Sequence, residues 1–150
     1  MKLIKIALFF ILIVTVACST LTLKPTDFAW PVESVLKIND DGKVVEDRYA
    51  IEFDTRGIFY EELQDSSAFV NKELRMLRDM NGYYFITSEK FKNVYVFKAD
   101  EGALVLENKI LVSETGVENP ALNQRKPFVE LIDGGKSLYL TKEGIDRTAK

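Results

Sequence analysis

Short turn signals divide most of this chain into brief runs rich in β-branched and aromatic residues. Each signal combines Asp or Asn with a glycine, and these signals lie at 39–42, 54–57, 81–82, 99–102 and 133–135. Glycine adopts positive φ at no steric cost and Asp and Asn tolerate it, so such combinations favour tight turns. The runs between the turns are therefore predicted to be strands. They cover residues 32–38, 43–53, 58–63, 83–87, 93–98, 103–112, 128–132 and 136–141.

The pattern of hydrophobicity predicts how these strands are buried. The run at 43–53 alternates, so we expect one strand with a buried face and a solvated face. The expected buried face carries Val45, Tyr49, Ile51 and Phe53, and the solvated face carries Glu46, Arg48 and Glu52. Residues 83–87, 94–97 and 103–107 are apolar on both faces, which predicts central strands of a sandwich or a closed barrel.

Residues 66–82 fit two different elements. Val70, Leu74, Leu77 and Met80 recur near helical spacing, which indicates a short helix near 67–80. The same residues also form a strand at 73–79 that leads into an Asn81-Gly82 hairpin. We favour the strand, because residues 83–87 need a partner and Asn-Gly is a strong hairpin signal.

Residues 114–127 are polar, contain two prolines and lack a clear period, so they are predicted to form a long surface loop. Most other connections are short, and short connections favour neighbouring antiparallel strands. The predicted fold is mainly β, a single antiparallel meander that forms a sandwich or a barrel, with one short helix near 67–80 as the alternative stated above.

The first residues have the pattern of a secretion signal. Lys2 and Lys5 precede an apolar stretch at 6–17, which is too short to cross a bilayer as a helix. The stretch ends in Thr15-Val-Ala-Cys18, and this end resembles the lipobox of bacterial lipoprotein precursors, with Thr15 where that box usually has leucine. The resemblance covers residues 1–20. It implies that Cys18 is diacylated and becomes the first residue after cleavage.

The resemblance also implies how the chain is divided and where it resides. Residues 1–17 are the expected signal peptide, 18–29 a lipidated tether, 30–145 one β-rich domain and 146–150 a C-terminal tail. Two or three acyl chains make membrane attachment stable, whereas one chain is marginal. Ser19 follows the cysteine where an aspartate favours retention at the inner membrane. The expected location is therefore the bacterial cell envelope, anchored by lipid in the outer membrane and facing the periplasm.

Composition excludes several functions for the mature chain. Residues 18–150 contain 18 Lys and Arg against 23 Asp and Glu, because Lys2 and Lys5 are lost with the signal, and this balance disfavours a nucleic-acid partner. The sequence has no histidine, and its one cysteine, Cys18, is expected to be acylated, so imidazole catalysis, His-ligated metals and thiolate chemistry are excluded. We expect no cofactor, no metal and no enzymatic activity.

Four patterns that resemble catalytic, metal-binding or phosphate-binding motifs are better explained by local structure. Ser34 and Lys37 have Ser-x-x-Lys spacing, but in a strand an offset of three places them on opposite faces. Glu61 and Glu62 are adjacent, so in a strand they also point apart and are expected to be solvated surface charges. Residues 39–42 and 133–136 lack the spacing of calcium and phosphate loops, and turns explain them.

The chain is rich in aromatic residues, and these suggest its function. The candidate binding surface comprises Trp30, Tyr83 and Tyr84. The leading hypothesis is a non-enzymatic binding or assembly module that recognises another envelope component through aromatic residues, a strand edge or the 114–127 loop. The alternative is a lipocalin-like carrier of an apolar small molecule, with the aromatic side chains lining its interior. The two hypotheses differ in where the aromatic side chains point.

Overall fold

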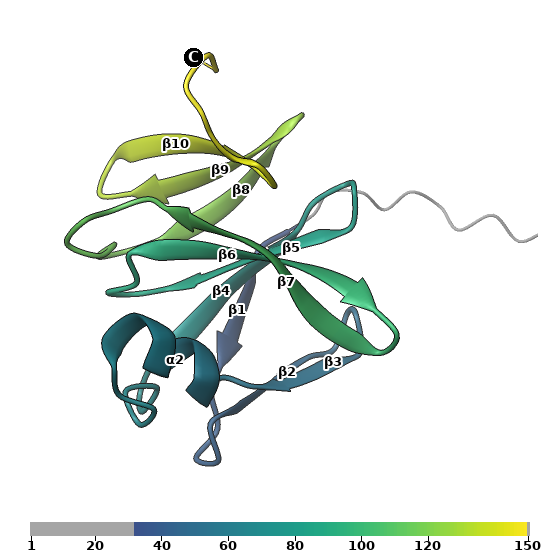
Figure 1. Ribbon diagram of the computed structural model, residues 1–150, viewed down its shortest axis with the longest axis vertical. Helices are drawn as coiled ribbons and strands as arrows, with labels where there is room; N and C mark the ends of the chain where they lie inside the picture. Colours follow the sequence, from purple (N-terminus) through teal and green to yellow (C-terminus); the bar gives the residue numbers. More distant parts are fainter. Residues whose placement is uncertain (1–31, 150) are drawn as a thin grey trace, which may run out of the picture.

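A computed structural model describes residues 32–149, so Cys18, Trp30 and the predicted signal and tether lie outside the described residues. The described residues are mainly antiparallel β-structure with one helix, and their strands form three separate sheets (Figure 1). The prediction of a mainly β, sandwich-like fold is therefore confirmed. Within residues 32–149 the strands do not close into a barrel.

The central layer is a five-stranded sheet in the order β1-β4-β5-β6-β7. Its strands are β1 (Ser34–Lys37), β4 (Glu73–Arg78), β5 (Tyr83–Ser88), β6 (Asn93–Asp100) and β7 (Ala103–Leu111). Strands β4 to β7 form a meander, and β1 pairs with the outer side of β4. A β-bulge shifts the β6–β7 register between Val96 and Phe97.

Two further units cover the faces of this sheet. Strands β8 (Ala121–Arg125), β9 (Phe128–Asp133), β10 (Lys136–Thr141) and β11 (Gly144–Asp146) form a second meander on one side. The hairpin of β2 (Lys43–Glu46) and β3 (Ile51–Asp54) lies on the other side with the helix α2 (Arg56–Leu63). Figure 1 shows the three layers, with the second meander above the central sheet and the hairpin and α2 below it.

Each face of the central sheet has its own hydrophobic core. Tyr84 and Ile86 of β5 belong to a first cluster, which the hairpin and α2 cover, whereas Phe85 belongs to a second cluster beneath the second meander. Consecutive residues of a strand point to opposite faces, so a strand buried on both faces is apolar throughout. This confirms the prediction that residues 83–87 and 94–97 form central strands.

Glu33, just ahead of β1, connects the layers. One oxygen of its carboxylate accepts a hydrogen bond from the Leu122 backbone nitrogen of β8 at 2.7 Å, and the other lies 3.4 Å from a guanidinium nitrogen of Arg75 on β4. Arg48, in the β2–β3 turn, donates to the Val32 carbonyl at 2.9 Å. The chain therefore enters the domain at a point held by all three sheets.

The prediction of one strand at 43–53 is wrong, because residues 47–50 form a turn between β2 and β3. Ala50 has a φ of 51°, which lies in the left-handed region. The turn also reverses the predicted faces of β2, since Val45 is 56% exposed whereas Glu46 is buried. The Tyr49 backbone nitrogen donates to the Glu46 carboxylate at 2.9 Å, so a buried acid stabilises the turn that breaks the alternation.

Residues 58–63, predicted as a strand, form most of α2 instead. The Thr55 carbonyl accepts hydrogen bonds from the nitrogens of Ile58 and Phe59 at 3.1 Å, which begins the helix, and Gln64 ends it in a left-handed conformation. The favoured strand at 73–79 is confirmed as β4, which ends at Arg78, and Gly82 has a φ of 86° in the predicted hairpin turn. The short helix therefore lies before residue 67, not near 67–80.

Three other predictions are corrected at the edges of the sheets. Residues 114–127 are not one loop, because Ala121–Arg125 form β8 and pair with β9. Strand β7 pairs only with β6 within the described residues, so it is an edge strand and not the central one predicted for 103–107. Its residues Val105 and Leu106 are accordingly exposed. Asp146, assigned to the tail, pairs with Tyr139 as the last residue of β11.

Candidate ligand-binding groove

The first core cluster is not completely covered, and its open side forms a groove of about 1060 Å³. The groove lies between the β2–β3 hairpin with α2 and the facing surface of β5, β6 and β7. Its lining is mainly apolar and comprises Tyr49, Ala50, Ile51, Glu52, Phe53, Asp54, Gly57, Ile58, Glu61, Tyr84, Ile86, Tyr95, Phe97, Ala99, Gly102, Ala103, Leu104, Leu106 and Lys109. A concave, mostly apolar site of this size suits a small organic ligand.

Cross-strand pairing builds the floor of the groove. Tyr84 of β5 pairs with Phe97 of β6, and Phe97 pairs with Leu106 of β7, so the three side chains form one row across the sheet. The register places Arg78 of β4 beside Tyr84 at the end of this row. The floor therefore runs from a cationic residue at β4 across aromatic rings to the exposed edge at β7.

The roof comes from the hairpin and the helix. Ile51 and Phe53 of β3 are half-buried against the first cluster, as are Tyr49 of the turn and Ile58 of α2. Their partly exposed surfaces line the groove opposite the floor. The turn that overturns the sequence prediction thus places an additional aromatic ring, Tyr49, at the groove.

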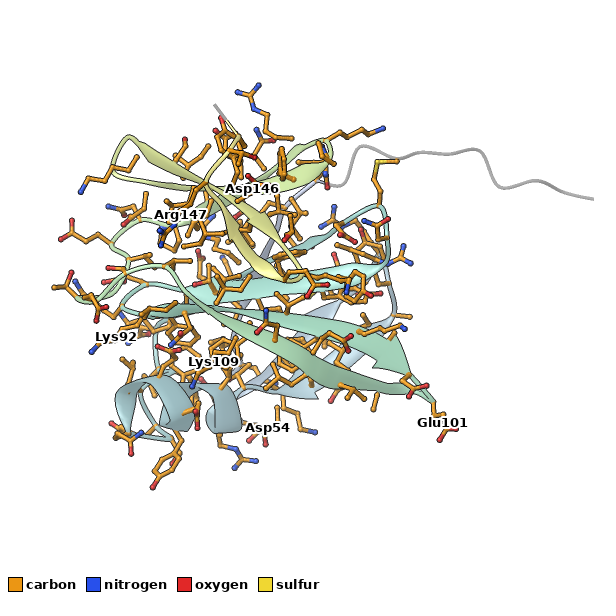
Figure 2. All side chains as sticks on the ribbon, turned by 45° about the horizontal axis from the view of Figure 1, so that its top comes forward. Asp54, Lys92, Glu101, Lys109, Asp146 and Arg147 are labelled. Atoms are coloured by element: carbon orange, nitrogen blue, oxygen red, sulfur yellow. The ribbon has the colours of Figure 1, made fainter. Side chains whose placement is uncertain are left out.

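Three carboxylates line the groove, and each has a basic partner. Glu52 pairs with Lys43 at 3.3 Å, Asp54 pairs with Arg56, and Glu61 pairs with Lys109 at 2.7 Å. Figure 2 shows Asp54 beside α2 and Lys109 above it.

One of these pairs has a clear effect on ionisation. Hydrogen bonds from Arg56 to the exposed Asp54 carboxylate lower the pKa of Asp54 to about 2.

Arg78 and Arg48 surround the aromatic end of the groove. The Arg78 guanidinium carbon lies 5.5 Å from the Tyr49 ring centroid and 5.7 Å from that of Tyr84. The Arg48 guanidinium lies 5.6 Å from the Tyr49 centroid. The rings of Tyr49 and Tyr84 meet edge to face at 5.7 Å. Stacking on aromatic rings fixes the orientation of a guanidinium, because its planar cation is attracted to the ring face.

A buried acid, Glu46, lies close to this aromatic end of the groove. Glu46 is 3% exposed, and its carboxylate accepts hydrogen bonds from Ser34 Oγ at 2.6 Å and Arg48 Nε at 2.7 Å. Burial alone raises the pKa of Glu46, but the hydrogen bonds from Ser34, Arg48 and the Tyr49 backbone outweigh it and hold the pKa below its usual value. Glu46 is therefore ionised at neutral pH and compensates the charge of Arg48.

Glu62 joins α2 to the central sheet beside the groove, and Tyr95 lies nearby. Glu62 accepts hydrogen bonds from the Lys92 backbone nitrogen at 2.8 Å and from Asn93 Nδ2 at 2.7 Å. The Tyr95 hydroxyl is buried and has no hydrogen-bond partner within residues 32–149. Burial, together with the neighbouring Glu62 carboxylate, raises the pKa of Tyr95 above its usual value, so its phenol stays protonated.

The structure separates the residues of the predicted binding surface. Tyr84 is buried in the first cluster and contributes one edge to the groove, whereas Tyr83 packs beside the second cluster on the opposite face. Lys142 Nζ lies 5.5 Å from the Tyr83 ring centroid. Trp30, like the lipidation candidate Cys18, is outside the described residues.

The structure shows where the residues of the Ser-x-x-Lys pattern and of the adjacent glutamate pair lie. Ser34 is buried against Glu46 whereas Lys37 is exposed on the opposite face of β1, as predicted. Glu61 and Glu62 lie on a helix, not on the predicted strand. Glu61 is exposed and paired, but Glu62 is half-buried and anchors α2, so the prediction that it is a solvated surface charge is wrong.

Neither membrane-spanning helices, nor metal-ligand clusters, nor relatives assign a further role to the described residues. No helix among residues 32–149 has the length and hydrophobicity needed to cross a bilayer. The same residues contain no cluster of three or more acidic side chains suited to a metal ion. Comparisons with protein families, curated proteins and solved structures find no significant match for this chain.

Sequence patterns did not reveal the groove or its cationic end. Tyr49 was assigned to the buried face of a continuous strand, and nothing in the sequence marked Arg78 as special. The available signal was the excess of aromatic residues, which is equally typical of a filled β core. The groove can be recognised only when the register of β4 to β7 and the position of the hairpin are known.

Proposed function

We propose that this chain is a lipid-anchored envelope protein that acts as a non-enzymatic binding module and takes an apolar ligand into the groove. The groove is the observation that carries this proposal. It exposes part of a hydrophobic core to solvent, and such exposure costs free energy unless an apolar partner covers it. The lipobox-like segment ending at Cys18 supports attachment to the outer membrane on its periplasmic side.

The aromatic side chains support ligand binding by their direction. Tyr49, Phe53, Tyr84, Tyr95 and Phe97 all contribute to the groove lining. This arrangement is what the carrier hypothesis requires, although the container is an open groove between a hairpin and a sheet, not the interior of a barrel. A groove open along one side admits a ligand without any rearrangement of the sheet.

Strand β7 supports a second candidate, an assembly module that pairs with a strand of another envelope protein. Val105, Leu106 and Leu111 are large exposed hydrophobic residues on this edge strand. Exposed edges recruit extended segments of other chains through backbone hydrogen bonds. The Asn108 side chain donates to the Lys142 carbonyl at 2.8 Å, so the turn between β10 and β11 contacts this strand at Asn108.

Native mass spectrometry of the full chain, extracted gently from its own envelope, distinguishes the two candidates. Spectra are recorded before and after denaturation, for the wild type and for two variants. Ala99→Trp places an indole in the groove, whereas Lys98→Trp places one on the opposite face of the same strand. The denatured mass also shows whether the chain begins at an acylated Cys18.

We expect a small-molecule adduct on the wild type and on Lys98→Trp that denaturation releases, and little or none on Ala99→Trp. The indole fills the volume that the ligand needs, so only the groove variant loses it. A protein-sized adduct in all three samples would instead favour the assembly module. Absence of any adduct from the wild type would contradict the proposal of a bound apolar ligand.

A further inference from the structure

The charges around the groove are unevenly compensated. The lining carboxylates Glu52, Asp54 and Glu61 are all paired, and Lys109 is the partner of Glu61. Arg48 is paired with Glu46 at the aromatic end. At that same end, no carboxylate among residues 32–149 forms an ion pair with Arg78. One uncompensated positive charge therefore remains beside the groove. The acidic turn residues Asp100 and Glu101 do not line it.

Arg78 does not itself line the groove, but it is held against two side chains that do. Its guanidinium lies over the rings of Tyr49 and Tyr84, which both line the groove. The stacking limits the conformations of a long side chain, so less entropy is lost when its donors engage a ligand. Arg78 is also exposed, so an anionic group bound there keeps part of its hydration.

We propose that the groove binds a single-chain amphiphile with a carboxylate head, such as a long-chain fatty acid. This assignment rests on the groove being the ligand-binding site proposed above. The carboxylate pairs with Arg78, and the chain lies along the row formed by Tyr84, Phe97 and Leu106. A guanidinium presents two parallel N–H donors that match the two oxygens of a carboxylate.

The chemistry of the two ends favours this class over neutral or cationic amphiphiles. Each methylene removed from water contributes about 0.8 kcal/mol, so an apolar chain accounts for most of the affinity. A cationic head would be repelled by Arg78, and a neutral head would gain no ion pair. The charge at Arg78 therefore selects the head, whereas the aromatic row binds any apolar chain.

Photolabelling in membranes that contain the full chain tests this selection. The probes are palmitic acid with a diazirine on its chain and hexadecanol with the same diazirine. Illumination attaches the probe to adjacent side chains, and peptide mass spectrometry then locates the label. The measured quantity is the ratio of acid to alcohol labelling on the peptides of β5, β6 and β7 that line the groove.

Three substitutions give the comparison. Arg78→Gln removes the charge, Arg78→Lys keeps it without the planar fork, and Arg147→Gln removes an exposed arginine outside the groove (Figure 2). We expect the acid-to-alcohol ratio to fall about three- to tenfold in Arg78→Gln, which is the range for a charged hydrogen-bonded pair that remains open to solvent. Arg78→Lys should retain most of the ratio, and Arg147→Gln all of it.

The alcohol provides an internal control, because its labelling of the groove shows that a variant is still folded. If both probes label the groove but the ratio is unchanged in Arg78→Gln, the groove binds apolar chains and the carboxylate assignment is wrong. If neither probe labels the groove in the wild type, the proposed function fails together with the carboxylate assignment.

Discussion

Replacement of Glu46 by glutamine is the most informative perturbation of this fold. Glu46 is a buried acid in a hairpin that sequence patterns assign to a single strand, and its carboxylate holds three elements together. It accepts hydrogen bonds from Ser34 of β1, from Arg48 and from the Tyr49 backbone. Arg48 also donates to Ser34 Oγ. Glutamine keeps the volume and one oxygen acceptor but removes the charge.

We expect Glu46→Gln to lower the free energy of unfolding by about 2 kcal/mol. A hydrogen bond to a charged group contributes about 1.5–3 kcal/mol, and glutamine weakens more than one of them. Two effects reduce the total. The neutral amide loses less solvation on burial than the carboxylate, and the Arg48 side chain is 43% exposed, so water screens its ion pair.

Chemical and thermal unfolding followed by circular dichroism measure this change. For a domain of this size, a loss of about 2 kcal/mol lowers the midpoint of thermal unfolding by about 8 °C. Glu52→Gln is the matched control, since Glu52 lies in the same hairpin and forms an exposed ion pair with Lys43. We expect that control to change stability by less than about 0.5 kcal/mol.

The pH dependence gives an independent check. A carboxyl group with a lower pKa in the folded than in the unfolded chain contributes stability above its unfolded pKa, and this contribution disappears as pH falls through the folded pKa. The difference between wild type and Glu46→Gln should therefore be full at neutral pH and shrink below about pH 4.5. A difference below about 0.5 kcal/mol at pH 7 would refute the role assigned to Glu46.

Two further substitutions test local features of the fold. Gly116→Ala should lower the free energy of unfolding by about 3 kcal/mol or more, because Gly116 has a φ of 92° and a Cβ there would lie 2.5 Å from the Lys90 carbonyl oxygen. Gly135→Ala is the control and should lower it by about 1 kcal/mol, because Gly135 has a φ of 82° but open space around it. Equal losses in thermal unfolding would contradict the steric argument. Glu62→Gln should cost about 1 kcal/mol in denaturant unfolding, because Glu62 joins α2 to β6, whereas Glu61→Gln should be nearly neutral. Equal effects of the two glutamates would show that α2 is held in another way.

The sequence predicted the strands that are buried on both faces better than those at the edges. Residues 83–86 and 94–97 are large and mainly apolar on both faces because the central sheet is covered on both sides, so their pattern correctly indicates central strands. Residues 103–107 have the same composition on an edge strand, where Val105 and Leu106 face solvent. Composition alone does not separate these two cases, since the difference arises from which strands lie alongside.

The sequence prediction did not include the β2–β3 hairpin, because a local interaction of a buried acid stabilises its turn. Alternation at 45–53 is interrupted on the predicted buried face only by Asp47, which lies at the start of the turn at 47–50. The deciding interaction is between Glu46 and a backbone nitrogen, and a buried acid on a strand is not expected from hydrophobicity. The groove depends on this turn, because Tyr49 lies there, so an error in one hairpin removed the site from the prediction.

The contacts around Val32 and Glu33 determine how this domain responds to mechanical load. A pull on the chain ahead of Val32 acts first on the hydrogen bond from Arg48 and on the two partners of Glu33, Leu122 and Arg75. Force applied at that end is thus shared among the hairpin, the central sheet and the second meander before it reaches β1. The start of the described domain is thus braced against all three layers, an arrangement that would suit attachment through the lipid anchor proposed at Cys18.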